Sequence, residues 1–169
     1  AQKNMGPAGL TVVIVREDLI GKAREITPIM LDYKVAADNH SMYNTPPCYA
    51  IYICKLVLEW IRDDIGGLDK MAEINKRKAG KLYNFIDSSR LFTAPVEVDS
   101  RSMMNVAFVT GDAELDRRFC LEAERRGLVN LKGHRSVGGM RASIYNAMPE
   151  AGVDALITFM KEFETSCSK

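Results

Sequence analysis

The densest group of chemically useful side chains is the segment Gly133-His-Arg-Ser-Val-Gly-Gly-Met-Arg141, which carries two arginines and a histidine among glycines. The guanidinium of arginine is a planar fork that matches a carboxylate or a phosphate through two parallel hydrogen bonds. Glycine lets the backbone approach a ligand closely. The segment is therefore a candidate anion site, although residue types alone favour a solvated loop with surface charges.

A second candidate is Asn44-Thr45, which stands directly before Pro46-Pro47. A hydroxyl N-cap followed by proline in the first turn is typical of a helix start, and we expect a helix from Thr45 to about residue 63. The free N–H groups and the positive dipole end of such a helix suit a phosphate group. A plain N-cap is the commoner use of these residues.

The third candidate is Lys3, which precedes the turn Gly6-Pro7-Ala8-Gly9. A tight turn directly before an apolar strand can hold a lysine at a fixed place against a sheet. A catalytic lysine must be desolvated, or lie near another cation, to be neutral and nucleophilic. A lone lysine near a chain end is more often simply exposed.

The elements that must position these groups differ between the two parts of the chain. Residues 10–16 are apolar and rich in β-branched side chains, which predicts a buried strand. Residues 26–47 have no clear period and predict a long loop. The helix that follows is apolar on nearly every face, which predicts a buried helix. We therefore interpret residues 1–65 as part of a larger layered domain.

After Gly66-Gly67 the pattern is that of a separate α/β layer, residues 66–169, with a few strands covered by helices. An amphipathic helix is predicted for residues 68–87, with an outer face rich in lysine. Its predicted inward face is Leu68, Met71, Asn75, Leu82 and Ile86. The remaining predicted elements are strands at 103–109, 128–132 and 140–146, and helices at 113–126 and from about Pro149 onward.

Composition excludes several classes of protein. The 169 residues carry 23 Lys+Arg against 22 Asp+Glu, which argues against a general nucleic-acid binder. The longest apolar stretch, residues 49–61, is too short to span a bilayer, and no secretory signal is expected. The four cysteines fit neither a CxxC pair nor a zinc ligand set, so we expect no metal, reduced thiols and a cytoplasmic location.

Three blocks of the chain together resemble one known family. Ala1-Gln-Lys-Asn-Met-Gly-Pro-Ala-Gly9, Ser41-Met-Tyr-Asn-Thr-Pro-Pro47 and Gly133-His-Arg-Ser-Val-Gly-Gly-Met-Arg-Ala-Ser-Ile-Tyr-Asn-Ala147 occur in the order found in phosphoserine aminotransferases. These are fold-type I, class V enzymes that use pyridoxal phosphate, and the resemblance covers their C-terminal half. Met5 departs from the branched aliphatic residue that is common in the family.

The resemblance implies a fold and a cofactor site. Residues 1–65 would be the end of the large cofactor domain, and residues 66–169 a small C-terminal α/β domain with a short, largely antiparallel sheet covered by helices. Lys3 would carry pyridoxal 5′-phosphate and move the proton between the substrate Cα and the cofactor C4′, with Gln2 bonding near the cofactor. In a homodimer, Asn44 and Thr45 would contact the partner's cofactor phosphate.

The resemblance also implies the substrates. Arg141 would pair with the substrate α-carboxylate, and His134 and Arg135 would meet the far anion, which is the phosphate of phosphoserine or the side-chain carboxylate of glutamate. The implied reaction converts 3-phosphohydroxypyruvate and glutamate into O-phosphoserine and 2-oxoglutarate, a step of serine biosynthesis. The family's N-terminal half supplies an aromatic residue and an aspartate for the cofactor ring, so we expect this chain alone to be inactive.

Two other interpretations stay open. The first is another fold-type I enzyme, such as an alanine–glyoxylate aminotransferase or a cysteine desulfurase. The pair His134-Arg135 beside Arg141 speaks against it, because those substrates lack a second strong anion. The second is a non-catalytic module that binds phosphorylated small molecules or only dimerises.

Overall fold

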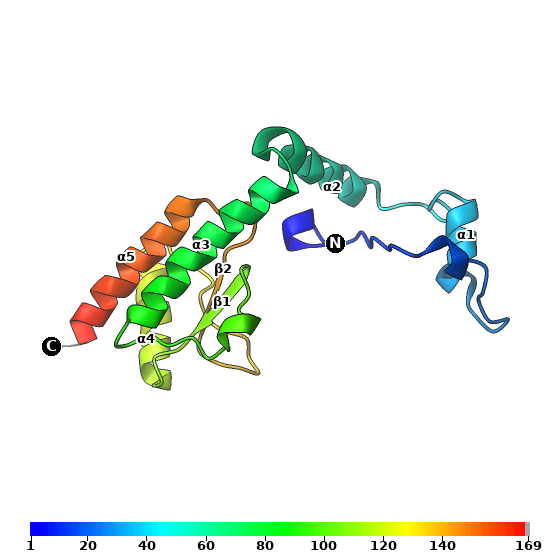
Figure 1. Cartoon of the computed structure of the whole chain (residues 1–169). Helices are drawn as coiled ribbons and strands as arrows, with labels where there is room; N and C mark the ends of the chain where they lie inside the picture. Colours follow the sequence, from blue (N-terminus) through cyan, green and yellow to red (C-terminus); the bar gives the residue numbers. More distant parts are fainter. Residues whose placement is uncertain (168–169) are drawn as a thin grey trace. The chain divides into compact units, whose positions relative to one another are not determined.

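The computed structural model describes residues 1–167, which form two compact units (Figure 1). The first unit runs from Ala1 to Trp60 and the second begins at Ile61. The sequence predicts the boundary between residues 65 and 66, directly before Gly66-Gly67. Within the described residues, no helix is long and apolar enough to cross a membrane.

The first unit contains two helices, α1 (Tyr33–Asp38) and α2 (Cys48–Trp60), and short 3-10 turns at Lys3–Met5, Glu17–Leu19 and Ile29–Leu31. Helix α2 begins at Cys48, and the Ile51 N–H donates to the Pro47 carbonyl at 3.0 Å. The predicted start at Thr45 is therefore wrong. A residue directly before proline is disfavoured in the helical region, which explains why the helix follows the proline pair instead of including Pro46.

Two further predictions for the first unit assume a larger layered domain, and this chain alone does not meet them. Residues 10–16 form extended chain rather than a buried strand, and the Ile14 side chain is 97% exposed. A strand needs a neighbour to pair with, and the described residues provide none here. Helix α2 is also not buried throughout: Ala50 and Cys54 are its buried residues, while Tyr49 is 73% exposed. An apolar helix is covered only where other elements pack on all its faces.

The second unit is a two-stranded antiparallel sheet with helices packed on it. Its strands are β1 (Asn105–Phe108) and β2 (Met140–Ser143), with Asn105 opposite Ser143 and Phe108 opposite Met140. The helices are α3 (Leu68–Ser88), α4 (Ala113–Arg125) and α5 (Glu150–Cys167), with a π-helical turn at Ile61–Ile65 and a 3-10 turn at Val98–Ser100. Helices α3 and α5 lie side by side (Figure 1). The predicted fold class, α/β with a short antiparallel sheet covered by helices, is confirmed.

The core of this unit follows from the alternation of side chains along the strands. Val106 and Phe108 of β1 and Met140 and Ala142 of β2 are buried, whereas the residues between them face the other way. Phe119 of α4 has no exposed surface and stands at the centre of an aromatic cluster. Its ring centroid lies 5.3, 5.7 and 5.2 Å from three neighbouring rings in edge-on arrangements, those of Phe92, Phe108 and Phe163.

Some predicted details of the second unit differ from the structure. Residues 128–132 contribute a single bridge, Lys132 to Met140, rather than a third strand. Leu68 is 74% exposed although the sequence places it on the inward face of its helix. It is the first residue of α3, one turn before the part of the helix that packs on the core. The rest of the predicted inward face is buried.

Candidate functional site

Arg141 lies on the face of β2 opposite the core, across from Ala107 of β1. Its backbone N–H donates to the Leu131 carbonyl at 2.7 Å, so β2 is hydrogen-bonded on both edges. The side-chain Nε is buried and has no hydrogen-bond partner among the described residues. Since buried donors are normally paired, an orphaned guanidinium N–H on a rigid strand marks a position suited to an anionic ligand.

A polar row continues from Arg141 along the same face. Ser143 and Tyr145 follow at alternate positions, and both donate to Asn105 Oδ1, from Oγ at 3.3 Å and from the phenol at 3.0 Å. Asn105 is also the ladder partner of Ser143. One amide oxygen therefore fixes two hydroxyl groups beside the arginine.

His134 and Arg135 lie in the loop between the Lys132 bridge and β2, and both are exposed. The loop is closed by a hydrogen bond from the Gly133 N–H to the Gly139 carbonyl at 2.8 Å. Gly139 has φ +63°, and a Cβ there would lie 2.5 Å from a Val109 methyl, so the loop end requires glycine. The glycines of this segment thus shape the turn.

The hydrogen bonds of His134 orient its ring. Nδ1 accepts from the Ser136 N–H at 3.3 Å and lies 2.7 Å from Ser136 Oγ. An accepting Nδ1 places the proton of the neutral ring on Nε2, which then donates outward. His134 and Arg135 therefore offer two adjacent N–H donor groups at the tip of one loop.

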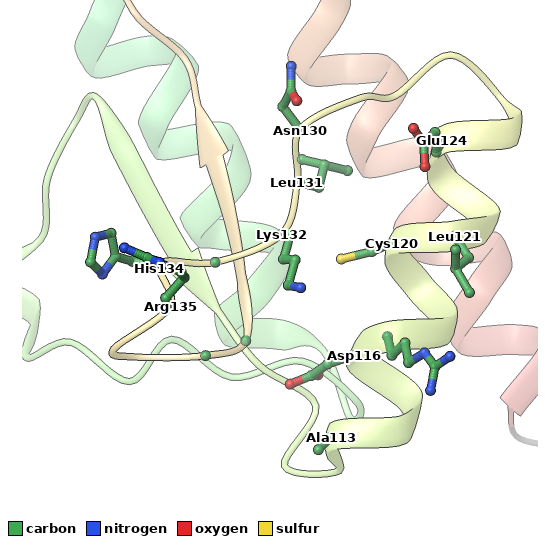
Figure 2. Close-up of a pocket in the computed structure, with 14 residues that line it drawn as sticks. Ala113, Asp116, Cys120, Leu121, Glu124, Asn130, Leu131, Lys132, His134 and Arg135 are labelled. Carbon is green, nitrogen blue, oxygen red and sulfur yellow. The ribbon is translucent and has the colours of Figure 1, made fainter.

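A groove of about 720 Å³ lies between α4 and residues 130–139. Figure 2 shows Lys132 and Cys120 within the space between α4 and the loop, and His134 and Arg135 of the loop also line the groove. Burial raises the pKa of the Cys120 thiol, with Asp116 adding to the effect, so the thiol is protonated at neutral pH and is a poor nucleophile. Arg141 does not line this groove. The structure therefore places His134 and Arg135 at this groove and Arg141 outside it.

The candidate cofactor residues all lie in the first unit. Lys3 is exposed, at the start of a 3-10 turn, and has φ +59°, which is uncommon for a residue other than glycine. The Gly6 N–H donates to the Lys3 carbonyl at 3.2 Å, and a Cβ on Gly6 would lie 3.4 Å from Ile53 of α2. The lysine-bearing turn is therefore seated on α2, with Gln2 exposed just before it.

Asn44 and Thr45 are exposed in the segment that leads into α2. The Asn44 side-chain amide donates to the Thr45 carbonyl at 3.4 Å. A primary amine, an amide and a hydroxyl before a helix make up the donor set that pyridoxal phosphate requires at its aldehyde and phosphate ends. The residues present fit this cofactor.

The residue that the sequence did not reveal is Lys78 of α3. Its side chain has no exposed surface, and its Nζ lies 2.9 Å from the carbonyl oxygens of both Tyr145 and Met148. Burial lowers the pKa of this ammonium, although Glu150 opposes the effect. The sequence contains one indication that Lys78 is buried, which is its place in the helical period. Met71, Asn75, Lys78 and Leu82 follow one another along one stripe of α3.

Comparison with known proteins identifies relatives over almost all of the chain. Residues 1–156 match the family described as aminotransferase class-V. A curated phosphoserine aminotransferase of Listeria monocytogenes is 61% identical over 163 residues, which are 96% of this chain and 44% of that protein. The chain therefore spans less than half the length of this relative.

Solved structures agree with this result. Phosphoserine aminotransferase from Bacillus circulans subsp. alkalophilus superposes with a TM-score of 0.93 at 48% identity, over 96% of this chain and 45% of that one. The enzyme from Trichomonas vaginalis with bound pyridoxal phosphate gives a TM-score of 0.77 at 42% identity, over 82% of this chain and 39% of that one. The resemblance inferred from the three sequence blocks is confirmed.

Proposed function

The chain belongs to the class-V aminotransferase family, and from that premise we propose that it forms the lysine-bearing and substrate-binding part of a phosphoserine aminotransferase. The reaction is transfer of the amino group of glutamate to 3-phosphohydroxypyruvate, which yields O-phosphoserine and 2-oxoglutarate for serine biosynthesis in the cytoplasm. The observation that carries the proposal is Arg141, whose buried Nε has no described partner on an otherwise well-bonded strand.

Arg141 would bind the α-carboxylate that all four reactants share. Its strand is fixed at both edges, so the guanidinium fork is held before the substrate arrives, and little conformational freedom is lost on binding. His134 and Arg135 would bind the second anion. Because they lie on a glycine-bearing loop, one pair of donors could accommodate both a phosphate and a carboxylate in successive half-reactions.

Lys3 would hold the cofactor and then take the proton from the substrate Cα. Pyridoxal phosphate, when bound, supplies the electron sink for that proton transfer. Gln2 would bond beside Lys3. Asn44 and Thr45 would hold the cofactor phosphate of the partner subunit in a homodimer, with the backbone N–H groups that start α2 close behind them.

The chain alone is proposed to be inactive. The first unit exposes large apolar side chains along its extended segment and α2, and its relatives are more than twice as long as this chain. The part of the relatives that this chain does not span would cover that surface and supply the contacts to the cofactor ring. Apolar surface of this extent marks a contact region.

The test treats the protein that carries this chain with borohydride in the presence of pyridoxal phosphate. Peptide mapping then shows which lysine the cofactor has modified. We expect selective modification of Lys3, whereas Lys22, an exposed lysine of the same unit, serves as the internal control. Phosphoserine added before the reductant should protect Lys3, and alanine should not. Equal labelling of Lys3 and Lys22 would contradict the assignment of Lys3, and protection by alanine alone would favour a different transaminase.

A further inference from the structure

Lys78 is a fully buried cation whose partners are all backbone carbonyl groups. Besides the contacts of 2.9 Å to Tyr145 and Met148, its Nζ lies 3.4 Å from the carbonyls of Ile144 and Asn146. An ammonium has three protons, so the two short contacts take one each and the third is shared between the two longer ones. One side chain therefore gathers four carbonyls of the segment that follows β2, those of residues 144, 145, 146 and 148.

A second residue of α3 holds the same segment. The Asn75 side-chain amide donates to Asn146 Oδ1 at 2.8 Å, and Asn75 is 4% exposed. Asn75 and Lys78 are three residues apart and share one face of the helix. Helix α3 thus clamps the chain where it leaves β2, at points 66 to 71 residues away in sequence.

The clamp is connected to the face that carries Arg141. Lys78 fixes the Tyr145 backbone, and the Tyr145 phenol donates to Asn105 Oδ1 at 3.0 Å. The same oxygen accepts from Ser143, which lies two residues after Arg141 on the same face. Lys78 is therefore linked, through Tyr145 and Asn105, to the C-terminal end of β2 and to β1.

We propose that Lys78 is a positioning residue for the substrate-carboxylate site: by gathering these four carbonyls it sets, through Tyr145 and Asn105, the register in which β2 presents Arg141. The proposal rests on the proposed role of Arg141. Lys78 itself touches no substrate, because its ammonium is enclosed by backbone. A small displacement of a binding group can lower the rate of an enzyme by about a hundredfold, so such a support is consequential.

Hydrogen exchange tests the structural half of the proposal without any activity. In the protein that carries this chain, Lys78→Met retains the apolar stem and removes every donor. We expect the amides of Arg141 and Ile144, which donate to Leu131 and Met104, to exchange about tenfold faster or more, while amides of α4 are unchanged. Lys81→Met is the matched control, since Lys81 lies on the same helix and pairs with Glu150 and Asp154 of α5.

Kinetics tests the functional half. Lys78→Met should raise the KM for glutamate about tenfold, leave cofactor retention unchanged, and have no further effect in an Arg141→Lys background. Lys81→Met should leave KM as in the wild type. Tyr145→Phe removes the phenol that donates to Asn105 and provides a milder variant in case Lys78→Met does not fold, with a smaller increase in KM expected.

The outcomes separate the two proposals. Lys78→Met could lower exchange protection equally in α4 and β2, while the KM per folded site stays unchanged in both Lys78→Met and Tyr145→Phe. That result would overturn the positioning role of Lys78 and leave it a purely stabilising one. A wild-type protein that shows no transamination would instead overturn the proposed function. In that case faster exchange confined to the amides of Arg141 and Ile144 in Lys78→Met would still support the clamp. Unchanged exchange at these two amides would exclude the clamp.

Discussion

The two units of this chain use apolar residues to opposite effect. In the second unit, Phe119 has no exposed surface, and the rings of Phe92, of Phe108 in β1 and of two α5 residues surround it. In the first unit, Ile14 is 97% exposed and α2 buries only Ala50 and Cys54. The difference shows that an apolar sequence pattern makes a core only where the same chain supplies the facing elements.

The sharpest test of this contrast compares Phe119→Ala with Ile14→Ala. Loss of the Phe119 ring leaves a cavity at the centre of the aromatic cluster, and we expect a decrease of about 3–5 kcal/mol in the free energy of unfolding. Ile14→Ala should change it by no more than about 0.5 kcal/mol, because the side chain is already in water. Urea denaturation of the wild type and of each variant measures the two changes in the free energy of unfolding. A large loss from Ile14→Ala would show that the first unit has a core after all.

The same contrast explains what the sequence could predict. Helices α3 and α4 were predicted within one or two residues, because their amphipathic period and their end signals are local. The strand predicted at residues 10–16 does not form, since strand pairing depends on a neighbouring strand and not on composition alone. Lys78 was missed for a related reason: an isolated lysine is expected to be exposed, and its carbonyl partners lie 66 to 70 residues further along the chain.

The candidate site divides along the same boundary. Lys3, Asn44 and Thr45 belong to the first unit, and His134, Arg135 and Arg141 to the second. Their types and order indicated an anion site and a cofactor lysine, and their roles remain predictions. What the sequence could not provide is the support of Arg141, because the register of β2 and the shared acceptor Asn105 arise only from tertiary contacts.

Substrate affinity should depend on the second unit. Arg141→Lys retains the charge but removes one arm of the fork, so we expect the apparent affinity for glutamate to fall by about tenfold to a hundredfold. Steady-state kinetics of the protein that carries this chain measures the change. Cofactor retention should be unaltered. Unchanged affinity for glutamate would exclude Arg141 as the carboxylate ligand.

Cofactor affinity should depend on the first unit. Thr45→Ala removes one hydroxyl contact to the proposed phosphate position, which corresponds to about 1 kcal/mol, or roughly a fivefold weaker retention of pyridoxal phosphate. Fluorescence or absorbance after dilution follows the loss, with the KM for glutamate as the control that should not move. If Thr45→Ala and Arg141→Lys alter the same quantity, the division of roles between the units is wrong.

The smallest expected effect concerns one ion pair in each unit. Arg101 donates to both oxygens of Asp87 at 2.7 Å, and these hydrogen bonds lower the pKa of Asp87 below its ordinary 3.8. In the first unit, Arg16 pairs with Asp18 only two residues away, with both side chains largely exposed. Asp87→Asn should therefore destabilise the chain slightly at neutral pH, and Asp18→Asn should have less effect still.

The pH dependence of that small effect has a defined sign. Because the pKa of Asp87 is lower in the folded state, its carboxylate stabilises the fold above about pH 3.8 and loses that contribution as the pH falls through the folded value. The difference in unfolding free energy between wild type and Asp87→Asn should shrink on acidification and vanish once Asp87 is protonated in both states. A difference that persists at such pH would show that the substitution perturbs packing instead, since an uncharged side chain then occupies position 87 in both proteins.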